Sequence, residues 1–240
     1  MEYEKIISGT FIDRPNRFIA HVNIEGRVET VHVKNTGRCR ELLVRGCKVI
    51  LEDFRGRRAL EKRKTQFDLI GVYKKIGRTN PLFKDDGLLL INMDSQAPNK
   101  VALEYLLTQN FDFIKPEFTY GNSRVDFYME KGSRKFLMEI KGCTLEENGR
   151  GLFPDAPTER GVKHLKELSK ALDEGFECIL GFVIQIPGVK EVSANVKTHP
   201  EFAEALNEAR KKGVKVLFLE CAVEENSLKI LPGDAFKFEF

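Results

Sequence analysis

The spacing of hydrophobic residues changes once along this chain of 240 residues. Up to about residue 80, apolar and polar residues alternate in short runs, which is typical of half-buried β-strands. After residue 87, segments with apolar residues three and four positions apart appear, as on one face of a helix. The segment between the two patterns, GRTNPLFKDDG at 77–87, is rich in Gly, Asn, Pro and Asp and has no period. The sequence therefore predicts two domains, residues 1–80 and residues 81–240.

The first domain is predicted to be a small β-barrel. Five strands are expected, at 4–11, 18–24, 27–34, 48–54 and 67–75. Between the third and fourth strands, Asn35-Thr36-Gly37 forms a turn that can cap a helix over 38–44, and Gly46 ends that helix. Five strands with one helix after the third is the order of an OB-fold barrel. Another kind of small five-stranded β-domain is the alternative.

The second domain is predicted to mix helices and strands. A helix over 99–109 precedes three strands that form a meander, at 117–120, 124–130 and 135–142. A long helix over 158–173, an apolar strand over 178–186 and a helix over 200–211 follow, and strands at 214–222 and 228–231 end the pattern. The predicted fold class is therefore mixed α/β, with an N-terminal OB-fold-like β-barrel followed by an α/β domain.

Charge is distributed unevenly between the two predicted domains. The whole chain has 39 Lys and Arg against 36 Asp and Glu, a formal net charge of +3 at pH 7. Residues 1–80 carry 18 basic and 10 acidic side chains, so residues 81–240 are acidic overall. A basic domain binds phosphate backbones through counterion release even when it reads no base. We therefore expect DNA as a partner, with the type of strand left open.

No segment of the sequence indicates secretion or membrane insertion. The first residues, MEYEK, are charged, and no apolar core of a signal peptide follows them. The most apolar run, at 178–186, is about half as long as a membrane span. The five cysteines are an odd number and include no C-x-x-C pair, which argues against a disulfide framework or a zinc site. A cytoplasmic location is the expectation.

The residues with the clearest chemical pattern lie on two neighbouring predicted strands. Asp126 lies within SRVDF, and FLMEIKG contains Glu139 and Lys141 two positions apart. Residues two apart on a strand point to the same face, and a hairpin around 131–133 would bring Asp126 near Glu139.

Mg²⁺ takes oxygen ligands, commonly one or two protein carboxylates with water or substrate phosphate. The sequence therefore predicts a site for Mg²⁺ or Mn²⁺ held by Asp126 and Glu139, with Lys141 placed to orient and help deprotonate an attacking water. An exposed Glu/Lys pair along an edge strand is the alternative.

The two acids and the lysine on an α-β-β-β-α-β frame resemble the PD-(D/E)xK nuclease superfamily, whose core residues 81–240 would cover. The resemblance implies that Asp126 and Glu139 are catalytic metal ligands, that Lys141 is the catalytic lysine, and that Glu104 on the first helix is an additional catalytic acid. Val125 stands where the literal motif has proline. Pro154-Asp155 is set aside because no D/E-x-K follows it.

Five further motifs give a closer resemblance, to the sugar fermentation stimulation protein A (SfsA) family. They are RPNRF at 14–18, NTGRCRELL at 35–43, SRVDF at 123–127, MEIKGCTL at 138–145 and FPDAPTERGVKHLKEL at 153–168, and they span both predicted domains. The resemblance implies a DNA-binding protein with an OB-type N-terminal part and a nuclease-like C-terminal part. The family name records a phenotype in sugar utilisation and specifies no reaction.

Basic side chains in and between these motifs are the candidates for nucleic-acid contacts. FRGRR at 54–58 lies between the fourth and fifth predicted strands, where an OB-fold loop often touches nucleic acid, although a solvated hairpin is the alternative. The basic residues of the helix over 158–173 can share one face, and a polar outer stripe is their alternative interpretation. The candidates are Arg17, Arg38, Arg55, Arg57, Arg58, Arg124, Arg160, Lys163 and His164.

The sequence thus predicts a DNA-binding protein that hydrolyses phosphodiester bonds with Mg²⁺ or Mn²⁺. The alternative is a DNA-binding or regulatory protein, linked to sugar metabolism, that keeps this fold without hydrolysis. A sugar-metabolising enzyme has little support, because the chain contains neither G-x-G-x-x-G nor G-x-x-x-x-G-K-[ST]. Nucleases that cut both strands are commonly two-fold dimers, so a homodimer is left open by analogy alone.

Overall fold

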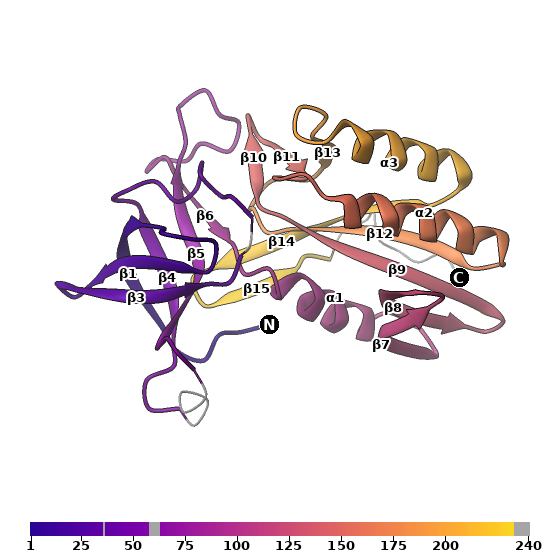
Figure 1. Ribbon diagram of the computed structural model, residues 1–240, viewed down its shortest axis with the longest axis horizontal. Coiled ribbons are helices and arrows are strands. Elements are labelled where there is room, and N and C mark those ends of the chain that lie inside the picture. The colour runs from indigo at the N-terminus through magenta and orange to yellow at the C-terminus, as the bar shows by residue number, and fades with distance from the viewer. Residues whose placement is uncertain (36, 58–62, 233–240) are drawn as a thin grey trace.

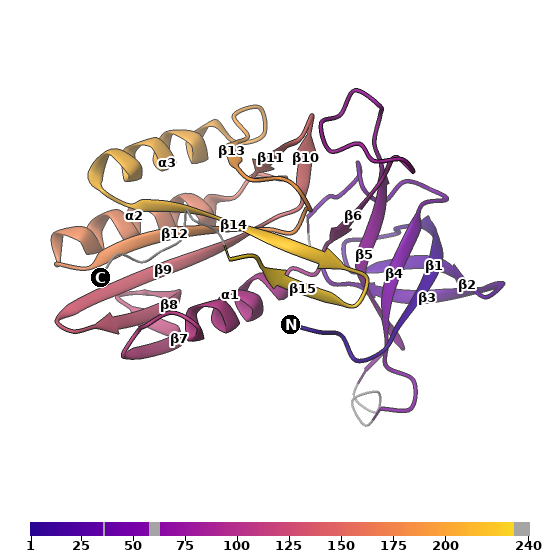
Figure 2. The same ribbon diagram turned by 180° about the vertical axis from the view of Figure 1, so that it is seen from behind.

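A computed structural model describes residues 1–35, 37–57 and 63–232 of the chain. The described residues form a β-barrel at one end of the molecule and a second, helix-covered sheet at the other (Figure 1). Seen from behind, the strands β14 (Lys215–Glu224) and β15 (Ser227–Ile230) reach toward the barrel (Figure 2). The two sheets therefore meet along a junction to which several distant parts of the sequence contribute.

The barrel consists of five strands in the order that the sequence predicts. They are β1 (Ile6–Asp13), β2 (Ile19–Ile24), β3 (Arg27–Val33), β4 (Lys48–Asp53) and β5 (Phe67–Lys75). The sheet runs β3-β2-β1-β4-β5-β6, and a parallel pairing of β3 with β5 closes it. Alternation decides what enters the core: Ala20, Val22 and Ile24 of β2 are buried, whereas His21 and Asn23 are not.

The predicted helix over 38–44 is wrong. The chain makes turns there, in which the amides of Leu42 and Leu43 both donate to the carbonyl oxygen of Cys39. Cys39 has a positive φ of 45°, a left-handed conformation that interrupts a right-handed helix. All three side chains are buried in the core of the barrel. The apolar residues that suggested a helical face are therefore packed into the core from a compact loop.

The strand β6 (Leu88–Asn92) is an addition that the sequence did not predict. It follows the irregular segment at 77–87 and pairs antiparallel with β5, so the first sheet continues past residue 80. The helix α1 (Ala97–Leu107) starts a few residues after β6 ends. The polypeptide thus passes from the barrel into the second sheet within a short segment.

The second sheet has the order β15-β14-β12-β9-β8-β7. Its strands are β7 (Phe113–Tyr120), β8 (Ser123–Lys131), β9 (Arg134–Cys143), β12 (Glu177–Ile184), β14 (Lys215–Glu224) and β15 (Ser227–Ile230). The first three form the predicted antiparallel meander, and β9, β12 and β14 run parallel. A small sheet of β10 (Leu145–Glu147), β11 (Arg150–Phe153) and β13 (Val192–Ala194) was not predicted.

Helices cover both faces of the second sheet. The helices α2 (Glu159–Asp173) and α3 (Pro200–Lys212) lie on one side of it and α1 on the other (Figures 1 and 2). On the α1 side, Val101 and Leu106 pack in one cluster with Met138 and Ile140 of β9. Among the described residues, no helix is both long and apolar enough to cross a membrane. The mixed α/β fold that the sequence predicts is confirmed.

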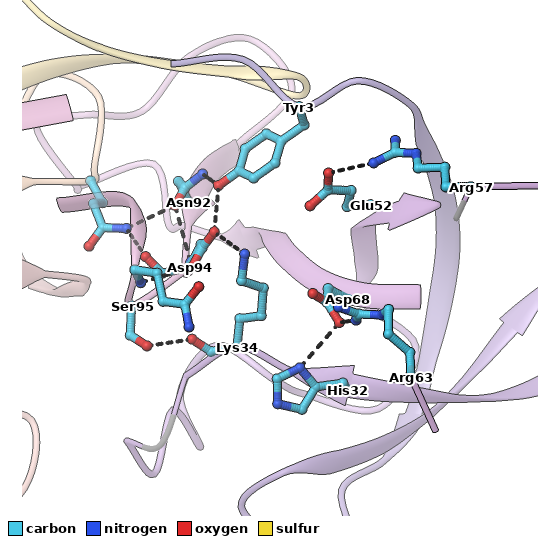
Figure 3. A network of polar contacts seen from close by, with 12 residues as sticks. Tyr3, His32, Lys34, Glu52, Arg57, Arg63, Asp68, Asn92, Asp94 and Ser95 are labelled. Atoms are coloured by element: carbon cyan, nitrogen blue, oxygen red, sulfur yellow. Dashed lines mark hydrogen bonds and ion pairs between the residues drawn. The ribbon is translucent and has the colours of Figure 1, made fainter. Parts of the chain in front are cut away.

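A buried polar network fixes the junction between the two sheets (Figure 3). Nζ of Lys34, just after β3, lies 2.7 Å from Oδ2 of the fully buried Asp94, which precedes α1. The Tyr3 hydroxyl donates to the same carboxylate at 3.2 Å and accepts from Nδ2 of Asn92 at 3.0 Å. Nε2 of Gln185, just after β12, donates to Oδ1 of Asn92 at 2.8 Å. A buried charge pair with its hydrogen bonds satisfied holds one geometry, so the start of α1 has a fixed place against the barrel.

Candidate active site

Two neighbouring strands bring Asp126 close to Glu139. Phe127 of β8 pairs with Met138 of β9, so Asp126 and Glu139 are the next residues on the two strands. Oδ2 of Asp126 accepts a hydrogen bond of 2.7 Å from the amide of Ile140. Oδ1 accepts one of 2.7 Å from Nδ2 of Asn99 in α1. Both oxygens of Asp126 are therefore held in place by uncharged N–H donors. These donors orient the carboxylate and do not neutralise its negative charge.

The side chains of β9 separate onto its two faces as the alternation predicts. Glu139 and Lys141 both contact His164 of α2, with Nζ of Lys141 2.6 Å from Oε1 of Glu139. Met138 and Ile140 face α1 instead. Gly142 follows, where an added Cβ would lie 2.7 Å from Pro98 and 2.6 Å from the Gln185 amide. Only glycine allows this close approach, which sets the start of α1 against the end of β9.

His164 holds one oxygen of Glu139. Nε of Arg160 donates to Nε2 of His164 at 3.2 Å. Because a guanidinium group only donates, Nε2 is the acceptor of the ring and Nδ1 carries the proton. Nδ1 therefore donates to Oε1 of Glu139, the same oxygen that accepts from Lys141. One residue that the sequence assigned to nucleic-acid contacts thus lies in the carboxylate site.

The other oxygen of Glu139 has no partner among the described residues. Glu139 is only 3% exposed, and its Oε2 is buried without a hydrogen bond. A buried carboxylate oxygen without a partner is unfavourable by several kcal/mol in order of magnitude. A cation coordinated at this oxygen would remove that penalty.

The protonation equilibria of the two acids differ. The pKa of Asp126 is raised, first by burial and then by the negative charge of Glu139. Burial also acts to raise the pKa of Glu139, but the hydrogen bond from His164 and the charge of Lys141 outweigh it, and the pKa is lowered. Two acids that repel one another in this way are stabilised by a cation placed between them.

The donor set fits a hard divalent cation with few protein ligands. Within the described ranges, no group of three or more His, Cys, Asp and Glu side chains suits a metal ion. Mg²⁺ needs no such group, because it keeps several waters and takes one or two carboxylates together with substrate phosphate. Asp126 and Glu139 supply that number of carboxylates.

Glu104 lies apart from this group. Its half-exposed carboxylate accepts a hydrogen bond of 2.6 Å from the N-terminal ammonium of Met1. Five positions separate it from Asn99, which places the two on different sides of α1. Asn99 is the α1 residue that touches Asp126, and no motif in the sequence distinguishes this asparagine. The catalytic role of Glu104 stays a prediction from the resemblance.

The described arginines of the basic run FRGRR form ion pairs within the barrel. Arg55 makes a two-pronged contact with the buried carboxylate of Asp53, with Nη2 2.8 Å from Oδ2 and Nε within 3.1 Å of both oxygens. Arg57 donates to Glu52 at 3.0 Å, as Figure 3 shows. Arg58 lies outside the described residues. The described arginines of this run therefore neutralise carboxylates of β4.

The remaining basic candidates fall into three environments. Arg124 forms an exposed ion pair of 3.0 Å with Glu117, and Lys163 lies 3.6 Å from Glu167. Arg160 touches His164 at the carboxylate site. Arg17 and Arg38 line one hollow of the barrel surface with a volume of about 470 Å³. The common helix face predicted for Arg160, Lys163 and His164 is thus divided, because His164 is buried and Lys163 is exposed.

The described cysteines are free thiols. Cys143, two positions after Lys141, is fully enclosed, and burial raises its pKa to about 12. A thiol with such a pKa stays protonated at neutral pH and is a poor nucleophile. Cys143 therefore acts as a small apolar residue of the core.

Two family models match most of the chain. Residues 12–79 match the "SfsA N-terminal OB domain", and residues 96–227 match the "Sugar fermentation stimulation protein RE domain". Two relatives are described as "Sugar fermentation stimulation protein homolog". One, from Desulfitobacterium hafniense (strain Y51), is 51% identical over 232 residues and 95% of each chain. The other, from Clostridium beijerinckii, is 47% identical over 234 residues and 96% of each chain.

A solved structure has the same fold throughout. It is described as "The structure of Pyrococcus Furiosus SfsA in complex with Ca2+", and it superposes with a TM-score of 0.78 at 26% identity. The match covers 96% of this chain and 95% of that chain. The barrel and the second sheet thus both have counterparts in known relatives, and the chain belongs to the sugar fermentation stimulation protein (SfsA) family.

Proposed function

We propose that this protein hydrolyses phosphodiester bonds of DNA with Mg²⁺ or Mn²⁺ held by Asp126 and Glu139. The single observation that carries the proposal is the state of Glu139. Oε1 is held by Lys141 and His164, whereas Oε2 is buried with no partner among the described residues. Neighbouring side chains orient a metal-binding carboxylate in this way, and they leave one oxygen free to coordinate a cation.

A relative supports the choice of a hard divalent ion. The solved structure of the Pyrococcus furiosus protein was described in complex with Ca²⁺. Ca²⁺ and Mg²⁺ both select oxygen ligands, although they differ in size and in the number of ligands they take. A site that admits Ca²⁺ is consistent with Mg²⁺ or Mn²⁺ as the ion that supports catalysis.

The bound ion would supply charge neutralisation at the phosphate and a nucleophile at neutral pH, and uncatalysed phosphate-ester hydrolysis is among the slowest reactions known. The protein's part is to position the reacting groups. The Lys141 ammonium has three N–H donors and directs one to Glu139, so it retains donors for an attacking water or a phosphate oxygen. His164 and Arg160 hold Glu139, while Asn99 and the amide of Ile140 hold Asp126.

The barrel supports DNA as the substrate class. It belongs to the N-terminal OB domain of the family, and residues 1–80 carry a clear excess of basic side chains. OB-folds bind single strands by a positive groove and exposed aromatic residues. The polar junction beside α1 keeps the barrel in a fixed position relative to the carboxylate site.

The proposal is tested by incubating the protein with labelled single-stranded, duplex and branched DNA in Mg²⁺ or Mn²⁺. Asp126→Asn and Glu139→Gln should lower the rate at least 100-fold, because each removes a ligand charge. Glu208→Gln, an exposed acid of α3, is the matched control and should cut at the wild-type rate. Glu104→Gln tests the role that the resemblance implies, and its contact with Met1 predicts less than a threefold change.

Cleavage by the wild type that does not exceed that of Asp126→Asn would overturn the proposal. If such a protein still binds DNA in EDTA, it is a DNA-binding protein without hydrolysis, which is the alternative function that the sequence leaves open.

A further inference from the structure

The barrel surface contains one hollow with an unusual concentration of arginine. It has a volume of about 470 Å³, and its lining includes Arg14, Arg17, Arg38 and Arg40 together with Asn16. These residues come from two loops, one between β1 and β2 and the other between β3 and β4. Four guanidinium groups around one hollow create a strongly positive potential.

Arg14 is the structural member of this group. Its Nη1 donates to the carbonyl oxygens of Gly37 and Arg38, both at 2.9 Å. Its Nη2 donates to those of Arg17 at 2.7 Å and Asn35 at 2.6 Å. One side chain thereby joins the two loops through four backbone contacts, so the walls of the hollow are set before any ligand arrives.

The other three arginines have no such contacts. Among the described residues, no hydrogen bond or ion pair engages the guanidinium groups of Arg17, Arg38 or Arg40, and all three side chains are exposed. A guanidinium group offers five N–H donors in a planar fork that matches phosphate oxygens in pairs. Three free forks around one preformed hollow fit a phosphate of a polyanion.

The hollow adjoins the segment that leads to the carboxylate site. A side chain at Gly37 would collide with the carboxylate of Asp155, so Asp155 of the second domain lies directly against this loop. The chain then enters α2 at Glu159 and reaches His164, which contacts Glu139. At about 1.5 Å per residue, these five residues advance by only roughly 7.5 Å along the helix axis. The hollow and the carboxylate site are therefore connected through the segment from Asp155 to His164.

An exposed aromatic ring stands next to Arg17. Phe18 is 56% exposed, although large apolar side chains are usually buried. Oδ1 of Asn16 accepts from the amides of Phe18 and Ile19 at 2.9 and 3.1 Å, which fixes the loop that presents the ring. An exposed ring beside a phosphate-binding group is the arrangement on which an unpaired base stacks. A base inside a duplex has no free face for such a contact.

From these features we infer that the hollow of Arg17, Arg38 and Arg40 binds a backbone phosphate of single-stranded DNA, and that Phe18 stacks on the adjoining base. The inference rests on the proposed function and makes it more specific, because it names unpaired DNA or an unpaired end as the substrate. Arg14 builds the hollow, and the other three arginines contact the ligand.

Binding is measured by fluorescence anisotropy in EDTA, with 3′-labelled single-stranded DNA of 12 nucleotides and a duplex of the same length. Arg17→Ala, Arg38→Ala and Arg40→Ala should each weaken single-strand binding about tenfold, as expected for a charge-assisted contact. Phe18→Ala should weaken it about tenfold as well. Arg27→Ala is the matched control, since Arg27 starts β3, at the far end of the β2–β3 hairpin and roughly 20 Å along β2 from this loop. It should change affinity less than twofold.

Two outcomes overturn the inference. The phosphate site is wrong if the three arginine variants bind single strands as tightly as Arg27→Ala does. The preference for unpaired DNA is wrong if the wild type binds the duplex at least as tightly and Phe18→Ala has no effect. Inorganic phosphate at millimolar concentration should compete, and competition lost in the arginine variants supports the site. Because no metal is present, failure here leaves the cleavage test of Asp126→Asn untouched, and failure of cleavage leaves this binding result untouched.

Discussion

Two arginine-bearing regions of the barrel share a residue type and differ in environment. In the segment from β4 to the start of β5, Arg55 and Arg63 contact the buried carboxylates of Asp53 and Asp68. In the hollow, the guanidinium groups of Arg17, Arg38 and Arg40 form no hydrogen bond or ion pair with any described residue, although Asp155 lies close enough to act on Arg38 electrostatically. A basic run in a sequence therefore indicates a binding surface only where its arginines form no ion pair within the fold.

Burial of the acids explains why the first region retains its arginines. Asp53 is 0% exposed and Asp68 is 2% exposed. A carboxylate removed from water needs a cation or several donors nearby. Arg63 also stacks over Phe54, with its guanidinium carbon 3.9 Å from the ring centre, which adds a cation–π contact. These arginines stabilise the barrel, and their charge is compensated within it.

The largest expected effect is on stability. Arg63→Ala should lower the free energy of unfolding by about 2–3 kcal/mol, because it leaves the Asp68 carboxylate buried beside His32 alone. Arg38→Ala should change it by less than about 0.5 kcal/mol, as for an exposed side chain that forms no hydrogen bond or ion pair with a described residue. Urea unfolding of both variants measures the difference. Equal losses would show that the two regions are not distinct.

The salt dependence of DNA binding should separate the same two regions. On single strands, counterion release contributes roughly 0.7 to the slope of log K against log salt for each neutralised phosphate. The double variant Arg17→Ala/Arg38→Ala should therefore lower this slope by about 0.7, whereas Arg57→Ala should leave it within about 0.2. Anisotropy titrations from low to moderate salt give the slopes. A lower slope for Arg57→Ala would place DNA on the β4 side.

A smaller change is expected from the acid at the edge of the hollow. Asp155 interacts electrostatically with Arg14 and Arg38, and burial, as the largest cause, raises its pKa. Asp155→Asn removes this opposing charge and should raise affinity for single-stranded DNA about two- to fivefold. The matched control Glu208→Gln, an exposed acid of α3, should not. Reduced affinity of Asp155→Asn would mean that Asp155 orients an arginine for binding.

The smallest effect is the pH dependence of stability, which has opposite signs for two acids. The hydrogen bond from Arg55, with that from Lys5, lowers the pKa of Asp53 although burial opposes them. Its stabilisation is complete above the unfolded-state pKa near 4 and is lost as pH falls through the folded-state pKa. Asp155, with a raised pKa, is stabilising below about pH 4, and this is lost as pH rises through its folded-state value.

Urea unfolding between pH 5 and pH 2 tests both signs. Asp53→Asn should reduce the acid-induced loss of stability by about 1 kcal/mol, since its exposed partners are partly screened by solvent. Asp155→Asn should increase the apparent loss, because it removes a group that opposes it. The same direction of change in both variants would contradict the assignment.

The sequence predicts the regular elements well where one physical signal dominates. Alternation in β2 and the separation of Glu139 and Lys141 from Met138 and Ile140 follow directly from the pleat of a strand. The prediction of a helix over 38–44 was wrong because two adjacent leucines form the same sequence pattern whether a helix face or a turn buries them. The strand β6 was missed because it lies directly after an irregular segment that resembles a domain boundary.

The candidate site was predictable in its acids and lysine, and less so in the groups that hold them. The spacing of two residues on a strand predicts that Glu139 and Lys141 share one face. The hairpin around 131–133 predicts that Asp126 lies near Glu139. The sequence showed His164 only as one of several basic residues at helical spacing. Its burial against Glu139 could not be predicted, because it depends on how α2 packs on β9. Asn99 carried no signal. Ion pairs that form only in the fold, such as that of Arg55 with Asp53, likewise decide which of the arginines remain free.

The claim on which the account depends is that Asp126 and Glu139 share a divalent cation. It is tested most directly by soaking crystals in Mn²⁺ and recording anomalous diffraction. We expect a single strong peak within coordination distance of Oε2 of Glu139 and of the Asp126 carboxylate, and we expect Glu139→Gln to abolish it. A saturating soak that leaves this position without a peak, or a peak bound elsewhere in the chain, would contradict it.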